Sequence, residues 1–308
     1  MNYCISYIKE FGLKMFVCTA PSRVFRKLRL SQKILDKYDC YKHIQVENFL
    51  YSQYKKIVNK EMVETNKAIE INKTGYVFWW QGEQDAPELV KICIKSIREN
   101  SGINIIVLSK ENLNEYVSLP KYIMQKFNEG KISLPHFSDI IRFNLLYDRG
   151  GVWIDATNLM TGKIPDSIFE FSFYSIKDAY KNSLGWKWTS FYMAAKKHDY
   201  LCGRMVDFYN QYWKEHDMAL TYLFLDCWLT VLYKKNNGVR QEIDSYHTSK
   251  LKVFELLQIL GNDFSENEYE NTCNESYIHK LTYKRKFAEK NNDKLTGWGY
   301  LKNQFILK

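Results

Sequence analysis

The sequence predicts an α/β fold with a central, mostly parallel sheet, and three neighbouring segments carry that prediction. Residues 74–82, TGYVFWWQG, form an apolar run that ends at polar Gln81 and Gly82, which is typical of a buried strand. Residues 86–100 place apolar side chains at near-helical spacing, and residues 103–109, INIIVLS, form a second apolar run. A strand, a helix and a strand without long loops make a βαβ unit, so a parallel sheet begins here.

The alternation continues toward the middle of the chain. Residues 119–132 predict another helix, and a further helix runs from about Pro135 to Arg149. Gly150–Gly151 ends that helix, because glycine tolerates the left-handed backbone of a helix exit. A short buried strand, VWI at 152–154, follows directly. We therefore expect this strand to join the same sheet.

The remaining chain is assigned more coarsely. We expect strands at 167–176 and 188–195, helices at 198–214 and 220–235, a polar acidic loop at 261–276, and a closing segment at 276–286. This divides the chain into a helical basic segment (1–72), a main domain (73–286) and a C-terminal tail (287–308). The 308 residues are 45% hydrophobic, which is enough for a sizeable core.

The positive charge gathers at the N-terminus. The whole chain carries a net charge of +9, and residues 1–60 hold twelve Lys/Arg against four Asp/Glu. A basic segment favours an anionic partner. Zinc spacing, a basic zipper and an aromatic RNA-binding signature are all missing from the sequence, so nucleic acid is disfavoured. Residues 11–30 mix apolar and basic side chains, which favours an anionic membrane surface, whereas 31–72 favour packing on the main domain.

The sequence also indicates a compartment. No apolar run reaches the roughly 18 residues of a membrane span, and the N-terminal stretch is interrupted by charges and is a poor signal peptide. Seven scattered cysteines without a Cys-x-x-Cys pair favour reduced thiols over a disulfide framework or structural zinc. We expect a cytoplasmic protein, peripheral on the inner face of the cell membrane.

One stretch concentrates chemistry: SDIIRFNLLYDRGGVWIDAT, residues 138–157. Asp139 and Arg142 are three apart on one helix and share a face, where Ser138 or Asp139 is expected to cap it. A carboxylate there accepts from sugar hydroxyls, and a guanidinium donates to anionic oxygens. Asp155 follows a strand end, where ligands of open parallel sheets bind, and its hard oxygens suit magnesium or manganese. Singly these residues fit a surface ion pair and a turn, but their ordered combination favours a nucleotide sugar.

This stretch resembles the core motif of capsular polysaccharide synthesis proteins. These are similar to the glycosyltransferases of family 32 and, more distantly, to the large clostridial toxin glucosyltransferases. VFWWQG (77–82) matches the family's first strand and SYIHKLTYK (276–284) its C-terminal motif, so the resemblance covers roughly residues 30–286. It implies a GT-A fold, a nucleotide-sugar donor and retention of anomeric configuration.

The resemblance also implies roles for particular residues. Trp79 stacks on the nucleotide base, while Ser138, Asp139 and Arg142 hold the donor. Asp155 is the first residue of the position usually written Asp-x-Asp, and Thr157 replaces the second aspartate.

Three further points concern the metal and the two substrates. Manganese or magnesium would then bind Asp155 alone, through waters with Thr157, or with His279. Lys280 or Lys284 would neutralise the departing diphosphate. Asp226 and Trp188 either contact the acceptor sugar or belong to the core.

The expected function is transfer of a hexose from a UDP sugar, UDP-glucose or UDP-galactose, to a hydroxyl of a lipid-linked oligosaccharide. Two alternatives stay open. One is a noncatalytic nucleotide- or sugar-binding protein, because Thr157 weakens the metal site. The other is a hydrolase that uses Asp139 and Asp155 as an acid–base pair, although Arg142 is expected to hold Asp139 ionised.

Overall fold

The structure is a computed structural model that describes residues 3–21, 25, 28, 30–61, 71–179, 184–247 and 249–306. Its centre is a sheet in the order β2-β1-β3-β6-β5. These strands span Asn104–Leu108 (β2), Thr74–Phe78 (β1), Gly151–Ile154 (β3), Tyr192–Ala195 (β6) and Phe173–Ser175 (β5). β1 lies parallel to β2 and β3, whereas β6 is antiparallel to β3 and β5. The predicted α/β class with a central sheet is confirmed, but the sheet is mixed, with two parallel and two antiparallel pairings, rather than mostly parallel.

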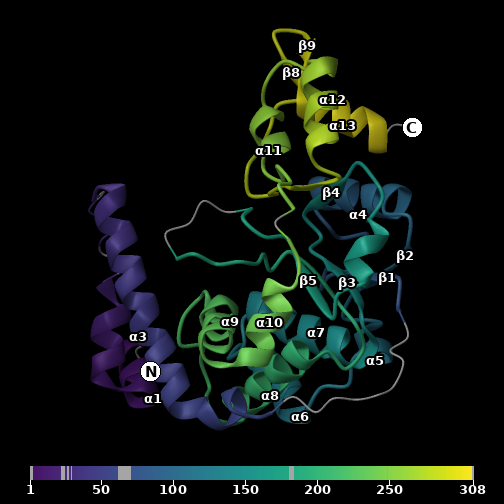
Figure 1. Ribbon diagram of the computed structural model, residues 1–308. Coiled ribbons are helices and arrows are strands. Elements are labelled where there is room, and N and C mark those ends of the chain that lie inside the picture. The colour runs from purple at the N-terminus through teal and green to yellow at the C-terminus, as the bar shows by residue number, and fades with distance from the viewer. Residues whose placement is uncertain are drawn as a thin grey trace.

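Helices surround this sheet (Figure 1). The longer ones are α4 (Glu88–Asn100), α7 (Leu134–Arg149), α8 (Tyr200–Glu215) and α9 (Phe224–Lys235), and the shorter ones are α5 (Leu113–Tyr116), α6 (Lys121–Asn128) and α10 (Asn237–Asp244). Aromatic side chains fill the space between them: the Phe208 and Trp228 rings stack 4.0 Å apart between α8 and α9. Aromatic packing thus holds α8 and α9 together.

The connection from α7 to β3 places the motif of residues 138–157. Gly150 ends α7 with φ of 68°, and Gly151 opens β3 with φ of 99°. A side chain at Gly151 would also collide with the carbonyl oxygen of Thr74 on the neighbouring strand β1. This tight approach requires glycine and fixes where β3 delivers Asp155. α7 itself begins at Leu134 after Ser133, so Ser138 and Asp139 are interior helix residues and not the expected caps.

A second, smaller sheet lies beside the turn that follows β3. β4 (Asn158–Met160) pairs antiparallel with β7 (Ile278–Lys280), with Asn158 opposite Lys280. This pairing brings the C-terminal motif back to the turn that follows β3, because Leu281 N donates to Thr157 O at 2.9 Å. The two motifs, more than 100 residues apart in the chain, therefore form one local structure.

The C-terminal part differs most from expectation. Residues expected to be an acidic loop contain helix α12 (Glu266–Glu275), because the Ser265 side chain caps it and acidic residues favour its first turn. Residues beyond 286 include α13 (Gly297–Phe305) and the short pair β8 (Lys290–Asn291) and β9 (Lys294–Leu295). With α11 (Glu255–Ile259) they form the upper part of Figure 1. Trp298, Leu301 and Phe305 are buried in a cluster with side chains of α4, so this segment packs on the fold.

One other expectation needs correction. The predicted strand 167–176 is a short 3-10 helix, η1 (Asp166–Phe169), followed by the three-residue strand β5.

The N-terminal part contains α1 (Tyr3–Thr19) and α3 (Gln32–Val58), which lie together as an upright pair (Figure 1). α1 docks through buried Tyr7, Phe11 and Met15, and the Tyr7 hydroxyl donates to Leu220 O at 2.8 Å. Part of the predicted membrane segment 11–30, and residues 62–70, lie outside the described residues.

Candidate functional site

A cavity of about 290 Å³ lies beyond the carboxyl ends of β1 and β3. Its lining includes Trp79, Ser138, Asp139, Arg142, Asp155, Thr157 and Asp226, all of which the sequence had singled out. β1 delivers Trp79, α7 delivers Ser138 to Arg142, β3 delivers Asp155, and α9 delivers Asp226. These segments therefore meet in one cavity at the edge of the sheet.

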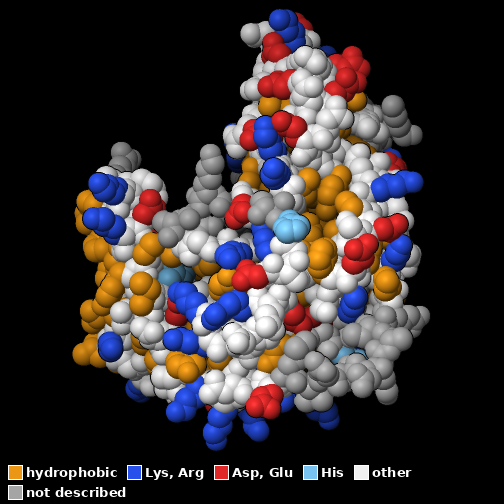
Figure 2. Space-filling model, viewed as in Figure 1, with side chains coloured by type: hydrophobic (Ala, Val, Ile, Leu, Met, Phe, Trp, Pro, Cys, Tyr) orange, Lys and Arg blue, Asp and Glu red, His pale blue; other side chains and the backbone are white. Residues whose placement is uncertain are grey.

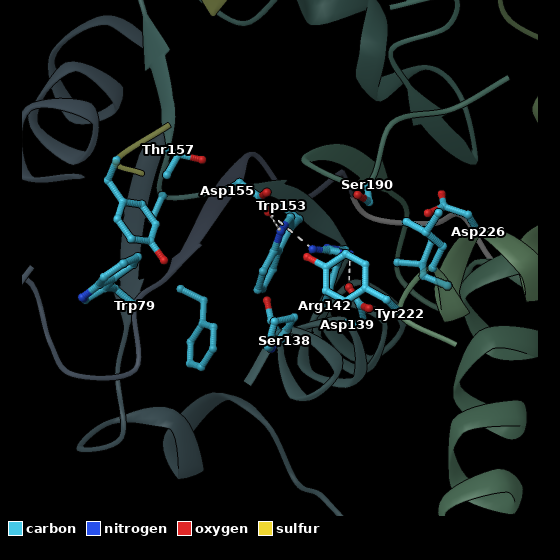
Figure 3. Close-up of a pocket in the computed structure, with 16 residues that line it drawn as sticks. Trp79, Ser138, Asp139, Arg142, Trp153, Asp155, Thr157, Ser190, Tyr222 and Asp226 are labelled. Carbon is cyan, nitrogen blue, oxygen red and sulfur yellow. Dashed lines mark hydrogen bonds and ion pairs between the residues drawn. The ribbon is translucent and has the colours of Figure 1, made fainter. Parts of the chain in front are cut away.

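Arg142 is the centre of the cavity's charge network (Figure 3). Its side chain is nearly buried, at 4% exposure. Nη1 donates to Asp139 Oδ1 at 2.7 Å, and Nη2 donates to Asp155 Oδ1 at 3.4 Å. The guanidinium also lies 4.9 Å from the centre of the Trp153 ring, within cation–π range. One arginine thus joins the helix carboxylate to the strand carboxylate.

Asp155 accepts from three donors. Trp153 Nε1 donates to its Oδ1 at 2.9 Å, beside the Arg142 contact, and Lys280 Nζ donates to its Oδ2 at 2.7 Å. Burial raises the pKa of Asp155, but the Lys280 and Arg142 charges outweigh this and hold its pKa below the ordinary value. Asp155 is therefore an anchored, ionised carboxylate.

Asp139 has a different balance. Burial raises its pKa above the ordinary value even though Arg142 and His136 oppose the shift. Arg142 opposes the shift, as expected of an ion-pair partner, but desolvation of the carboxylate outweighs it. The two carboxylates of the motif consequently differ in their affinity for protons.

Asp226 lies toward the opposite end of the lining from Trp79 (Figure 3). Its Oδ1 accepts from Trp188 Nε1 at 3.0 Å. Burial raises the pKa of Asp226 to about 7, with the Trp188 hydrogen bond opposing and the Asp139 charge adding to the shift. Trp188 is 3% exposed and does not line the cavity, and its hydrogen bond positions Asp226.

Three further sequence candidates, His279, Lys280 and Lys284, lie outside the cavity lining. His279 is fully buried, its Nε2 lies 3.0 Å from Thr161 Oγ1, and burial lowers its pKa to about 4. Neighbouring side chains of a strand point to opposite faces of the sheet. Because the Lys280 side chain contacts Asp155, the adjacent His279 side chain points away from Asp155. The Lys284 side chain is exposed and away from the lining. Of the two lysines, only Lys280 touches the charge network.

The expected metal site fits these residues poorly. The sequence offered Asp155, Thr157 and His279, but His279 is elsewhere and Thr157 adds only a hydroxyl. Among the described residues no group of three or more His, Cys, Asp or Glu side chains is arranged to hold a metal ion. Both oxygens of Asp155 already accept from cationic groups. The residues around Asp155 therefore do not form a ready site for a divalent ion.

Several lining residues were missed by sequence reasoning. Tyr283 faces Trp79, with ring centres 5.5 Å apart in an edge arrangement, and Tyr222 lies near Asp226, 71% exposed. Trp153 had a usable signal: it is two residues before Asp155 in a strand, and such residues share a face. Tyr283 lies in the C-terminal motif 276–284, but no role was expected for it. Tyr222 lies on a segment whose place in space depends on tertiary packing, so no local pattern marks it.

The fold and the site together define an α/β protein with a charged cavity, edged by aromatic rings, at the carboxyl ends of its parallel strands. Comparison with known families goes further: the family described as capsular polysaccharide synthesis protein matches residues 26–297. The chain belongs to this family, which confirms the resemblance seen in its motifs.

Comparison with individual proteins adds little detail. A search of curated proteins found no significant match. Among solved structures, the chain is similar to the PaToxG glycosyltransferase, at 15% sequence identity and a TM-score of 0.40, over 80% of this chain and 100% of that one.

Proposed function

We propose that the protein is a glycosyltransferase that moves a hexose from a nucleotide-diphosphate sugar to an acceptor hydroxyl during polysaccharide synthesis. The observation that carries the proposal is the buried Arg142, held between Asp139 and Asp155 at the edge of the sheet. This arrangement offers both a donor for anionic oxygens and acceptors for sugar hydroxyls in one cavity. Membership of the capsular polysaccharide synthesis family supports the same role.

The donor would lie along the cavity from the aromatic end to the carboxylates. Trp79 and Tyr283 line that end together, so a nucleotide base would stack on one ring against the edge of the other. The diphosphate would then reach Arg142, and the hexose hydroxyls would reach Asp139 and Ser138. At about 290 Å³ the cavity encloses only part of such a donor, so the remainder lies in the open mouth. We propose a UDP-hexose as this donor.

The reaction breaks the bond between the anomeric carbon and the diphosphate oxygen, and a bond to the acceptor oxygen forms. The departing diphosphate accepts the acceptor's proton, while Arg142 stabilises its negative charge. We propose retention of configuration, with the acceptor entering from the face that the diphosphate leaves. Asp226, whose pKa lies at about 7, is partly ionised at neutral pH and would accept a hydrogen bond from the acceptor.

The N-terminal helices would hold the enzyme at a membrane that carries a lipid-linked acceptor, on the cytoplasmic face. Their outer side is largely hydrophobic (Figure 2): Leu13 and Val17 on α1 are 63% and 60% exposed, and Ile34 and Ile44 on α3 are each 49% exposed. Exposed lysines accompany them, Lys14 among them. Such a surface suits an anionic bilayer. None of the described helices is long and apolar enough to cross one.

Vesicle sedimentation tests this membrane contact without disturbing the core. Deleting α1 would remove the buried side chains that dock it, so the better variant is Leu13→Ser with Val17→Ser. It should lose binding to phosphatidylglycerol vesicles, while Ile306→Ser, at a comparably exposed site elsewhere, should not. Equal binding of both variants would place the membrane contact on another surface.

Thermal shift tests the transferase site itself. The purified protein is melted with UDP, GDP, CDP and their hexose conjugates, because a ligand of the native state raises Tm by mass action. One nucleotide class should raise Tm, and its sugar conjugate should lose this effect in Asp139→Asn. A protein whose Tm responds to none of these ligands would contradict the proposed function.

A further inference from the structure

The Asp155 carboxylate is already neutralised by this chain's own cations. Lys280 Nζ donates to Oδ2 at 2.7 Å, and Arg142 Nη2 and Trp153 Nε1 donate to Oδ1 at 3.4 and 2.9 Å. A magnesium ion bound to Oδ2 would sit roughly 2.0–2.1 Å from that oxygen, where it would compete with the Lys280 ammonium. Lys280 and Arg142 therefore supply at Asp155 the positive charge that a bound metal ion would otherwise supply.

Lys280 is held there by the backbone. Strand β7 pairs with β4 so that Lys280 lies opposite Asn158, one residue after Thr157. Lys280 N donates to Val253 O at 2.7 Å, and Leu281 N donates to Thr157 O at 2.9 Å. These bonds on either side of the lysine fix it to the turn that carries Asp155. The side chain keeps 20% exposure, so it is not enclosed in the core.

The residue at position 157 also disfavours a divalent metal ion. A second carboxylate at residue 157 would favour a divalent cation, but Thr157 is neutral. The two carboxylates of the motif, Asp139 and Asp155, are matched by two cations, Arg142 and Lys280. The uncompensated negative charge that usually attracts a divalent ion is therefore missing from this group of four residues.

We propose that Lys280, with Arg142, neutralises the donor diphosphate in place of a divalent metal, so that nucleotide binding by this protein needs no metal ion. This rests on the proposed function, because it concerns the diphosphate of that donor. Lys280 is a compact point charge on a flexible stem, so it can shift from Asp155 toward a phosphate oxygen. Asp155 then serves as its anchor rather than as a metal ligand.

Isothermal titration calorimetry tests the proposal on the full chain. The dissociation constants of UDP, GDP and CDP are measured in excess EDTA and again in 1 mM manganese, a condition of the assay. We expect the nucleotide that binds to do so equally, within about twofold, in both buffers. In EDTA, Lys280→Ala should weaken nucleotide binding by about 10- to 100-fold, as the loss of a charged hydrogen bond predicts. Lys280→Arg should recover part of the lost affinity. The control Lys286→Ala removes an exposed lysine nearby and should bind as the wild type does.

The outcomes separate the proposal from the function on which it rests. Binding by the wild type only in manganese would overturn the metal-free proposal and leave the transferase site standing. Wild-type affinity in folded Lys280→Ala would overturn it as well. Binding of no nucleotide in either buffer would overturn the proposed function together with this inference. The wild-type comparison needs no variant, so a folding defect in Lys280→Ala leaves the test intact.

Discussion

Replacing Asp226 by asparagine should make the protein more stable at alkaline pH. Burial raises the pKa of this carboxyl from 3.8 to about 7. Between those values the folded state holds more protons at this site than the unfolded state, so the free energy of unfolding falls as pH rises through that window. Asparagine keeps an oxygen for the Trp188 hydrogen bond and removes the charge.

The size of the effect follows from the shift. About three pKa units correspond to at most ~4 kcal/mol above pH 7, and to roughly 1.5 kcal/mol at pH 5. The advantage of Asp226→Asn should therefore grow by about 2–3 kcal/mol between pH 5 and pH 8, or about 5 °C in Tm for a chain of this size. Asp139 and Arg142 are the charged groups that act on Asp226, and they oppose each other.

Thermal melts at pH 5, 6.5 and 8 measure this directly. The wild type, Asp226→Asn and the control Asp85→Asn, at an exposed carboxylate, are compared in the same buffers. The gap between Asp226→Asn and the wild type should widen with pH, and the control should follow the wild type. Parallel pH profiles for all three proteins would refute the assignment of a raised pKa to Asp226.

Two further predictions concern the centre and the aromatic end of the cavity. Arg142→Gln leaves two buried carboxylates without their shared cation, so urea unfolding should show a loss of about 3–5 kcal/mol; an unchanged midpoint would mean that the network contributes nothing. Trp79→Ala should weaken nucleotide binding by about 1–3 kcal/mol, the usual worth of stacking on a base, and Trp79→Phe should retain most of it. If calorimetry finds that Trp79→Ala binds the nucleotide as tightly as the wild type does, the base does not stack on this ring.

Much of the fold could be predicted from local patterns. The βαβ unit of residues 74–109 and the glycine exit at Gly150–Gly151 follow from apolar runs and from backbone geometry that only glycine tolerates. The cap of α7 was misplaced because several polar residues near its start could serve, and only the backbone shows that Ser133 precedes the first turn. Helix α12 was missed because its polar, acidic composition resembles that of a loop.

The site was predictable as a set of segments but not as a network. Asp139, Arg142 and Asp155 converge because helix α7 and strand β3 are adjacent in the chain. The partnership of Lys280 with Asp155 joins segments 125 residues apart, through a strand pairing that no local pattern reveals. Side chains alternate between the two faces of a strand, so when Lys280 points toward Asp155, His279 points away from it. The expected metal ligand His279 and the observed cation Lys280 therefore cannot both contact Asp155.

The most direct test of the transferase assignment is turnover of the nucleotide sugar that the protein binds. Release of nucleoside diphosphate is measured with water alone and with a polyprenyl-diphosphate-linked disaccharide as acceptor, for the wild type and for folded Asp139→Asn. We predict release that the acceptor accelerates in the wild type, with a glycosylated product, and little release in the variant. Tight binding without any release from the wild type would contradict the account and identify a noncatalytic nucleotide-sugar-binding protein.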